Sequence, residues 1–390
     1  MNTVDIITHM GRNKVCIIAT AAIESPPNNS YAGVEQVSWS LAEGLAKMQN
    51  DVWLITTNES SKLGLFTAKD PSGNEVGRLE VKTAGPKDWG PQGERNMFIS
   101  YHQWLEQEFG EGQGVVIDYS WGGWPYCLAA GKLGLAKHPN MKIMHLCHAM
   151  ANWFDPMSQK FAVPPVPFPR LTGVSAGQAA YLSSQYGVPV KYLYNGITLP
   201  PKSEAVSHDN YLLSLNRISI EKGIHNCIDV AFRTNNKIKL VGADSWVDQK
   251  YVSDIYDKCW FSNGQAEYYG HVDTQTKWEL LKNCKALVAA PDPSRYVEAF
   301  GIYAVESLAL GKPVVALRNG GLVDIIQNNI NGFLCNSVDE MVDVIRSGRL
   351  DSINPDNCRL SAERFTVENM CAKYQEFING IMSGSNEYNW

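Results

Sequence analysis

Residues 285–317 read KALVAAPDPSRYVEAFGIYAVESLALGKPVVAL, and this stretch contains one complete unit of strand, loop, helix and strand. KALVAAP (285–291) and PVVAL (313–317) are continuous apolar runs, as expected of parallel strands that are buried on both faces. Between them, apolar residues at helical spacing predict a helix from about Gly301 to Gly311. A parallel α/β arrangement follows for this part of the chain.

The same alternation of apolar strands and helical patterns recurs along the rest of the chain. In the C-terminal half the further expected elements are YLLSL (211–215), a helix from about Lys222 to Arg233, KIKLVG (237–242), AEYYG (266–270) and a helix across WELLKNC (278–284). In the N-terminal half they are VCIIAT (15–20), a helix at VSWSLAEGLAKM (37–48), DVWLITT (51–57), GVVIDYS (114–120), a helix around YCLAAGKLGL (126–135), MKIMHLCH (141–148), LTGVS (171–175) and VKYLYN (190–195). The expected fold class is α/β, with two Rossmann-like, doubly wound domains. Ligands of such sheets bind beyond the carboxyl ends of the strands, so two facing domains would share an interdomain cleft.

The polar, proline-containing stretch NGITLPPKSEAVSHDN (195–210) separates the two sets of elements. We therefore expect an N-terminal domain over residues 1–198 and a C-terminal domain over residues 199–364. In residues 365–390, the segment FTVENMCAKYQEFINGIM (365–382) predicts a terminal helix that packs back toward the N-terminal domain, with Thr366 as its N-cap. The proline-rich FAVPPVPFPR (161–170) predicts an extended surface loop.

Composition sets limits on the class of protein. A chain of 390 residues with 44% hydrophobic residues exceeds the roughly 250 to 300 residues that one core usually supports, which favours two domains. The net charge of -6 provides no basic footprint for nucleic acid or an anionic membrane. Nine cysteines form no CxxC pair, which favours a reducing compartment. The N-terminus lacks the apolar segment of a secretory signal, and no apolar run reaches the roughly 20 residues of a transmembrane span. The sequence thus predicts a soluble, cytoplasmic protein.

Ordered segments along nearly the whole chain resemble one known family, the retaining GT-B glycosyltransferases of the GT4 group (glycosyl transferases group 1). These segments are YAGVEQVSWSLAEGLAKMQNDVWLIT, GVSAGQAAYLSSQYGVPVKYLYNGI, LNRISIEKGI and EAFGIYAVESLALGKPVVALRNGG. The resemblance implies a GT-B fold and the transfer of a hexose from a nucleoside-diphosphate sugar, UDP-glucose-like, to a hydroxyl group. The order and spacing of the segments point to the fold and the activity class, and they leave the sugar and the acceptor open.

Two basic residues, Arg217 and Lys222, follow the strand YLLSL. They suit a diphosphate, which binds as an anion and gains charge when its bond to the sugar breaks; the alternative is a pair of ordinary solvated loop charges. Gly33 opens the next helix after the first strand, where backbone amides favour anions, although it could be a simple turn residue. In the resembling family these positions contact the diphosphate, and Asn216 and Ala32 here occupy places where that family commonly has glycine.

Two glutamates lie on either side of the predicted helix start, Glu298 on the preceding loop and Glu306 about one and a half turns into the helix. Taken alone, Glu298 would face the helix N-terminus and Glu306 would be a solvated surface residue. The resemblance implies instead that Glu298 binds hydroxyl groups of the donor sugar and that Glu306 binds the ribose. It also implies that the backbone amides of Phe300, Gly301 and Ile302 lie close to the sugar and the phosphates.

His148 ends the strand MKIMHLCH at a position that would face the cleft. Such a histidine is more often a hydrogen-bonded structural residue than a catalytic one. The resemblance places it near the donor sugar and the reacting carbon, with Ala149 in place of the family's usual aspartate. Together with Arg217, Lys222 and Glu298, His148 completes the implied catalytic set.

Other functions share parts of this pattern. A GT-B-shaped sugar-nucleotide epimerase would keep the nucleotide site without an acceptor pocket, and a nonenzymatic nucleotide-sugar binding protein would bind donor without turnover. A dehydrogenase is disfavoured because no GxGxxG follows the first strand, where the longer loop IESPPNNSYAGVE stands. No DxD motif is present, so we expect no metal and no cofactor beyond the sugar nucleotide itself.

The acceptor and the oligomeric state are left open by the sequence. The tryptophan-rich segments YSWGGWPY (119–126) and ANWFDP (151–156) suit stacking on a sugar or a base, and suit equally a place in the N-terminal core. A growing glycan, a small metabolite, a lipid-linked sugar and a modified nucleic acid are the candidate acceptors, with the acidic composition disfavouring the last two.

Overall fold

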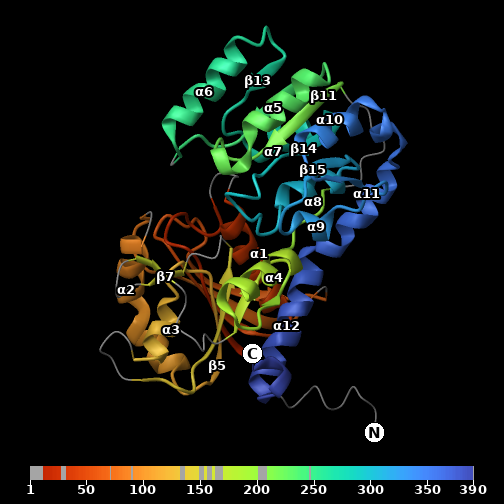
Figure 1. The fold of residues 1–390 in the computed structure, drawn as a ribbon. Coiled ribbons are helices and arrows are strands. Elements are labelled where there is room, and N and C mark those ends of the chain that lie inside the picture. The colour runs from red at the N-terminus through yellow and green to blue at the C-terminus, as the bar shows by residue number, and fades with distance from the viewer. Residues whose placement is uncertain are drawn as a thin grey trace.

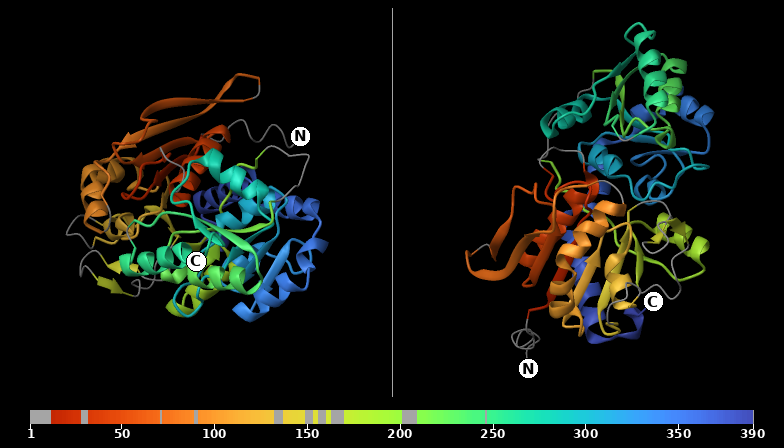
Figure 2. Two further views of the ribbon diagram at one scale, coloured as in Figure 1. Left: turned by 90° about the horizontal axis from the view of Figure 1, so that it is seen from above. Right: turned by 90° about the vertical axis from the view of Figure 1, so that its left-hand side faces the viewer.

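The computed structural model describes residues 12–27, 32–70, 72–88, 91–131, 137–148, 153–155, 160–162, 170–200, 209–245 and 247–389. These residues form two α/β domains, one above the other, which confirms the predicted fold class (Figures 1 and 2). Residues 163–169 of the expected loop at 161–170 lie outside the described residues, as do parts of ANWFDP and residues 201–208 of the interdomain linker.

The N-terminal sheet has eight strands in the order β10-β9-β6-β5-β1-β2-β4-β3. The strands are β1 (Lys14–Ile18), β2 (Asp51–Thr56), β3 (Gly64–Lys69), β4 (Glu75–Thr83), β5 (Gly114–Asp118), β6 (Lys142–Cys147), β9 (Leu171–Gly173) and β10 (Lys191–Tyr192). All neighbours pair in parallel except β3 and β4, which form an antiparallel hairpin at one edge. A separate two-stranded ribbon joins β7 (Trp153–Asp155) and β8 (Lys160–Ala162).

Alternation along β1 explains why this sheet is covered on both faces. Val15 and Ile17 join the core beneath α1 (Gly33–Lys47), whereas Cys16 and Ile18 join a second core beneath α2 (Pro91–Phe109) and α3 (Trp124–Ala129). Because successive side chains of a strand point to opposite faces, a continuous apolar strand requires helices on both sides. A further helix in the described part of this domain is α4 (Ala176–Tyr186).

The C-terminal sheet has six parallel strands in the order β13-β12-β11-β14-β15-β16. The strands are β11 (Tyr211–Leu215), β12 (Lys237–Val241), β13 (Ala266–Tyr268), β14 (Ala286–Ala289), β15 (Val314–Leu317) and β16 (Gly332–Cys335). The helices are α5 (Ile224–Arg233), α6 (Gln249–Trp260), α7 (Thr274–Asn283), α8 (Ile302–Ala309), α9 (Leu322–Ile325), α10 (Val338–Arg346) and α11 (Pro355–Ala362). This is the 3-2-1-4-5-6 strand order of doubly wound sheets, in which the direction of winding reverses between β11 and β14. In the N-terminal sheet the reversal falls between β1 and β5.

The terminal helix α12 (Val367–Ser383) leaves the C-terminal domain and runs along the N-terminal domain (Figure 1). Its N-cap is Thr366, as predicted, and the hydroxyl of Thr366 accepts a bond from the backbone N–H of Asn369. Gly44 of α1 lies so close to α12 that a Cβ there would come within 2.2 Å of the Cys371 sulfur. The chain therefore ties the two domains together at two places, the linker after residue 195 and this returning helix.

One predicted boundary needs correction. The expected helix from about Lys222 begins at Ile224, because Gly223 adopts a left-handed conformation (φ 63°) that separates a short 3-10 turn (Ile220–Lys222) from α5. Lys222 consequently lies in the turn rather than in the helix.

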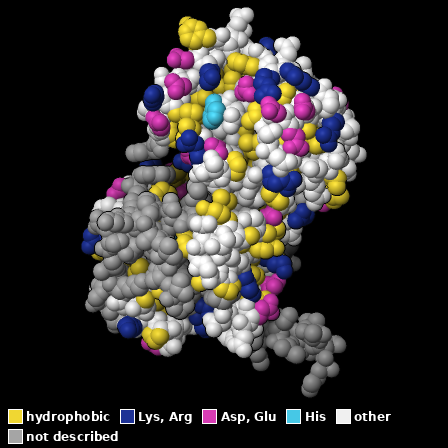
Figure 3. All heavy atoms as spheres, in the orientation of Figure 1, with side chains coloured by type: hydrophobic (Ala, Val, Ile, Leu, Met, Phe, Trp, Pro, Cys, Tyr) yellow, Lys and Arg dark blue, Asp and Glu magenta, His cyan; other side chains and the backbone are white. Residues whose placement is uncertain are grey.

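Surface charge agrees with the composition. On the face drawn in Figure 3, acidic and basic side chains are interspersed over the C-terminal domain rather than gathered into a patch of one sign. Among the described residues, no helix combines the length and the apolar character that crossing a bilayer requires.

Candidate active site

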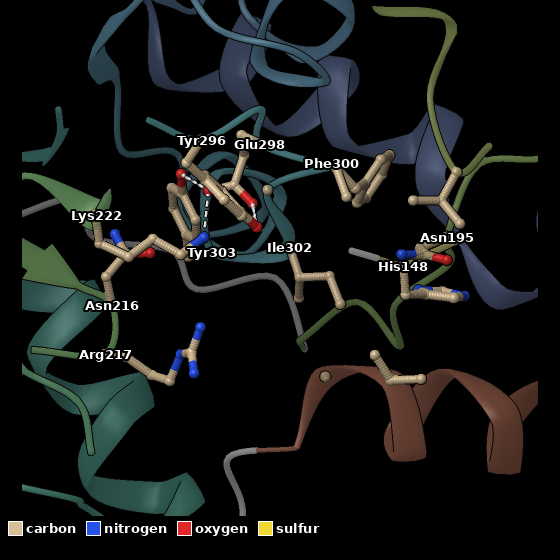
Figure 4. Close-up of a pocket in the computed structure, with 15 residues that line it drawn as sticks. His148, Asn195, Asn216, Arg217, Lys222, Tyr296, Glu298, Phe300, Ile302 and Tyr303 are labelled. Carbon is tan, nitrogen blue, oxygen red and sulfur yellow. Dashed lines mark hydrogen bonds and ion pairs between the residues drawn. The ribbon is translucent and has the colours of Figure 1, made fainter. Parts of the chain in front are cut away.

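The predicted site residues come together where the two winding reversals face each other. A cavity of about 240 Å³ lies between the domains, beyond the carboxyl ends of β1 and β6 on one side and of β11 and β14 on the other (Figure 4). Every predicted site residue except Glu306 lines it. Its described lining consists of Gly33, Val34, His148, Val174, Asn195, Asn216, Arg217, Lys222, Tyr296, Glu298, Ala299, Phe300, Gly301, Ile302 and Tyr303.

A buried ion pair dominates the C-terminal wall of this cavity. The Lys222 ammonium lies 2.7 Å from Oε2 of Glu298, and the two side chains are 10% and 6% exposed. Burial alone would lower the pKa of Lys222, but the Glu298 carboxylate outweighs that effect and leaves the pKa raised. Lys222 thus remains positively charged throughout the physiological range, and it lies 4.2 Å from the ring centre of Tyr296.

Arg217 supplies a second, more accessible cation. Its side chain is 39% exposed, and its guanidinium lies 3.5 Å from the Glu221 carboxylate, a surface pair of the kind that contributes little free energy. Because that contact is weak, Arg217 is available to an incoming anion. The cavity therefore presents one exposed and one buried positive charge on the same loop.

The loop that carries Glu298 is held by backbone contacts on both sides. The amide N–H of Glu298 donates to the Asn319 side chain at 3.0 Å, and the Glu298 carbonyl accepts from the N–H of Gly321 at 2.8 Å. Gly320 makes this approach possible, since a Cβ at that position would meet the Glu298 carbonyl oxygen at 2.0 Å. The paired glycines at 320 and 321 thus serve to hold the Glu298 loop.

Gly301 is the N-cap of α8 and has a φ of 104°, a conformation that residues with side chains rarely adopt. It turns the chain so that the first-turn amides of α8 open toward the cavity, where they favour an anion. Phe300 is almost fully buried, and its ring packs against Phe365 and Tyr194.

Glu306 lines a second, larger cavity of about 580 Å³ that adjoins the first at Gly33, Ile302 and Tyr303. Its carboxylate lies 2.5 Å from the ammonium of Lys277 on α7, and each side chain is 11% exposed. Glu306 is therefore not the solvated surface residue that its position alone would suggest. Lys277 is a partner that the sequence pattern did not reveal, because it lies 29 residues away on another helix.

His148 lies on the N-terminal side of the first cavity. Its ring stacks on Tyr119 at 4.8 Å, and Nε2 is buried without a hydrogen-bond partner among the described residues. Burial, with a smaller effect of His145, lowers the pKa of His148 to about 3. His148 is consequently neutral near pH 7, which suits a hydrogen bond to a hydroxyl group better than the transfer of a proton.

Asn195 is a cavity residue that sequence reasoning missed. It is 3% exposed, it lines the cavity, and its Oδ1 has no hydrogen-bond partner among the described residues. Figure 4 shows Asn195 beside His148, at the opposite end of the cavity from Lys222 and Glu298. Because it also lines the cavity, the Asn195 amide is a candidate contact for a ligand group.

The structure places some residues of the two tryptophan-rich segments. Trp124 is buried and stacks on Phe98 at 5.6 Å, which makes it a core residue. Trp121 is partly buried, and its backbone N–H donates to the buried carboxyl group of Glu94 at 2.7 Å. The side chains of residues 151–156 lie outside the described part of the chain.

Comparison with known proteins identifies a family domain in the C-terminal part of the chain. Residues 197–364 match the model of the family described as Glycosyl transferases group 1. A stretch of 128 residues, 32% of the chain, is 31% identical to the uncharacterized glycosyltransferase MJ1607 of Methanocaldococcus jannaschii. That alignment covers 31% of MJ1607, so the chain spans about a third of this relative.

Solved structures show likeness over nearly the whole chain. Sucrose-phosphate synthase from Thermosynechococcus elongatus has a TM-score of 0.70 at 16% identity, over 96% of this chain and all of that one. HepE of Anabaena, solved in complex with UDP-glucose, has a TM-score of 0.65 at 14% identity, over 94% of this chain and 99% of HepE. The fold is thus GT-B, and the C-terminal domain carries a Glycosyl transferases group 1 domain.

Proposed function

We propose that this protein is a retaining glycosyltransferase that moves a hexose from a nucleoside-diphosphate sugar, UDP-glucose-like, to an acceptor hydroxyl group. The observation that carries the proposal is the buried Lys222–Glu298 pair beside Arg217, at the winding reversal of a group 1 domain. Such a cluster offers positive charge to a diphosphate and a carboxylate to sugar hydroxyl groups within one cavity.

The two adjoining cavities suggest how a donor would lie. The diphosphate would bind between Arg217, Lys222 and the first-turn amides of α8, with the Gly33 turn opposite. The hexose would then reach Glu298, and the nucleoside would occupy the larger cavity with its ribose at Glu306. UDP-glucose as the donor is supported by HepE, whose structure contains it.

The chemistry follows from where charge develops. As the bond between the sugar carbon and the diphosphate oxygen breaks, negative charge grows on the departing phosphate, and Arg217 and Lys222 stabilise it. The acceptor oxygen would attack the same face of the sugar and pass its proton to that phosphate oxygen. Glu298 is the one carboxylate among the described residues that line the cavity, and it is already bound to Lys222 and Tyr303. Because these bonds occupy Glu298 and the described lining contains no second carboxylate to act as a nucleophile, the site favours this same-face route over a covalent glycosyl-enzyme intermediate.

The acceptor would enter from the N-terminal domain, where the neutral side chains of His148 and Asn195 suit hydroxyl groups. The proposed reaction uses no metal, and a cytoplasmic location remains our expectation.

The direct test is a mass-spectrometric screen of the full chain with UDP-glucose and a panel of glycans, small metabolites and lipid-linked sugars. We expect a product that carries one added hexose, with the configuration at the transferred carbon retained in its NMR spectrum. Arg217→Ala should abolish the product, while Arg346→Ala, an exposed residue on α10, should not. Release of an epimerised donor or an inverted product would contradict the proposal.

A further inference from the structure

Tyr303 is a third group on the Glu298 carboxylate, in the first turn of α8. Its hydroxyl donates to Oε2 of Glu298 at 2.9 Å, and its ring lines both adjoining cavities. The side chain is 6% exposed, so this bond is shielded from water. Figure 4 draws the contacts of Lys222 and Tyr303 with Glu298.

The two oxygens of the Glu298 carboxylate have different partners among Lys222, Tyr303 and Tyr296. Oε2 accepts from the Lys222 ammonium at 2.7 Å and from the Tyr303 hydroxyl. Within the described part of the chain, Oε1 has a single, long contact of 3.5 Å with the Tyr296 hydroxyl. A carboxylate oxygen has two good lone-pair positions, so Oε2 is saturated and Oε1 is not. A sugar hydroxyl would therefore be received at Oε1.

Binding of a diphosphate would change this balance. A bound diphosphate would share the ammonium N–H groups of Lys222 with Glu298 and would repel the Glu298 carboxylate, since both are negatively charged. Glu298 would then be a buried carboxylate whose interaction with Lys222 is weaker than in the free protein. Tyr303 is neutral, so a phosphate competes for it far less, and its hydroxyl stays with Oε2.

We propose that Tyr303 is a positioning residue for donor recognition: its hydroxyl holds the Glu298 carboxylate so that Oε1 faces the hexose while Lys222 engages the diphosphate. This inference rests on the proposed function. It assigns to the Tyr303 hydroxyl an effect on the sugar part of the donor alone, because that hydroxyl bonds Glu298. The ring, which also lines the proposed nucleoside cavity, has no part in this effect.

The test is isothermal titration of the full chain with two probes, UDP and UDP-glucose, in the absence of acceptor. Tyr303→Phe keeps the ring and removes only the hydroxyl. We expect the Kd for UDP to stay within about twofold of the wild-type value and the Kd for UDP-glucose to rise about tenfold, the scale of one hydrogen bond to a charged group. Tyr211→Phe is the matched control, because it also removes one buried hydroxyl bond, to the Leu280 carbonyl, far from the cavity. It should leave both Kd values unchanged.

Equal weakening of both probes by Tyr303→Phe would show a merely structural role and would overturn the inference. Unchanged binding of both probes would overturn it as well. A wild-type chain that binds neither probe would refute the proposed donor along with the role of Tyr303. Binding and transfer by the wild type with an indifferent Tyr303→Phe would refute the role of Tyr303 alone.

Discussion

Neutralising the Lys222–Glu298 pair one member at a time separates its part in stability from its part in activity. Lys222→Met keeps the length of the side chain and removes the charge, and leaves a Glu298 carboxylate that is 6% exposed without its cation. Loss of one partner of a buried ion pair costs about 3 to 5 kcal/mol, and the remaining Tyr303 bond places this case near the lower value. Glu298→Gln leaves a buried ammonium and should cost about as much.

The double variant Lys222→Met/Glu298→Gln should behave differently, because it leaves no unpaired charge behind. Buried ion pairs are often replaced by neutral groups at little cost, so we expect a loss of about 1 kcal/mol. Transfer activity should fall about 100-fold or more in all three variants, since the phosphate loses its buried cation or the sugar its carboxylate.

The assay is urea unfolding followed by circular dichroism, with transfer from UDP-glucose measured on the same preparations. Recovery of stability without recovery of activity is the expected result for the double variant. If its loss of stability equalled the sum of the two single losses, the two side chains would not be acting as a pair. Near-normal transfer in Lys222→Met would remove Lys222 from the mechanism.

Three further variants test other parts of the site. His148→Gln should lose transfer activity to the same extent at pH 6.5 and pH 8.5, because His148 is neutral at both. As the pH falls from about 6.5 toward 3, only the unfolded state binds a proton at His148, so the melting temperature of the wild type should fall faster than that of the variant. Lys277→Met removes the partner of Glu306, and it should raise the KM for the donor about tenfold with little change in kcat, because Glu306 lies away from the reacting bond. Lys373→Met, which removes an exposed ion pair on α12, is its control. A fall in kcat at constant KM would contradict the assignment of Glu306 to the ribose. Gly301→Ala should destabilise the chain by about 1 to 3 kcal/mol because of its φ of 104° and a 2.7 Å approach to Leu322, and an unchanged melting temperature would count against that strain.

The fold could be predicted where strands are buried on both faces. β1, β5, β11 and β14 are mostly apolar and almost wholly buried, and that pattern follows from parallel sheets covered by helices. The hairpin of β3 and β4 was not predicted, because β3 is exposed along its length and carries no apolar alternation. An edge strand of this kind owes its structure to pairing with β4 rather than to its own pattern.

Some residues of the site could likewise be predicted from the sequence, and others could not. Arg217 and Lys222 lie on the connection after β11, and Glu298 and Gly301 lie on the connection after β14, so the fold brings them to one edge of the sheet. Asn195, Tyr303 and Lys277 act through contacts that depend on the packing of separate elements. Tyr303 lies among apolar residues of α8, where an aromatic residue is normally predicted to belong to the core. Its other role is indicated by its hydrogen bond to Glu298, which the sequence does not show.

The most direct test of the proposed site is a crystal structure of the full chain with UDP bound. We predict the diphosphate within hydrogen-bond distance of Arg217 and Lys222, the ribose hydroxyl groups on Glu306, and the β-phosphate pointing toward Glu298. A nucleotide bound with its phosphates away from Arg217 and Lys222, or outside the two adjoining cavities, would contradict the proposed function at its foundation.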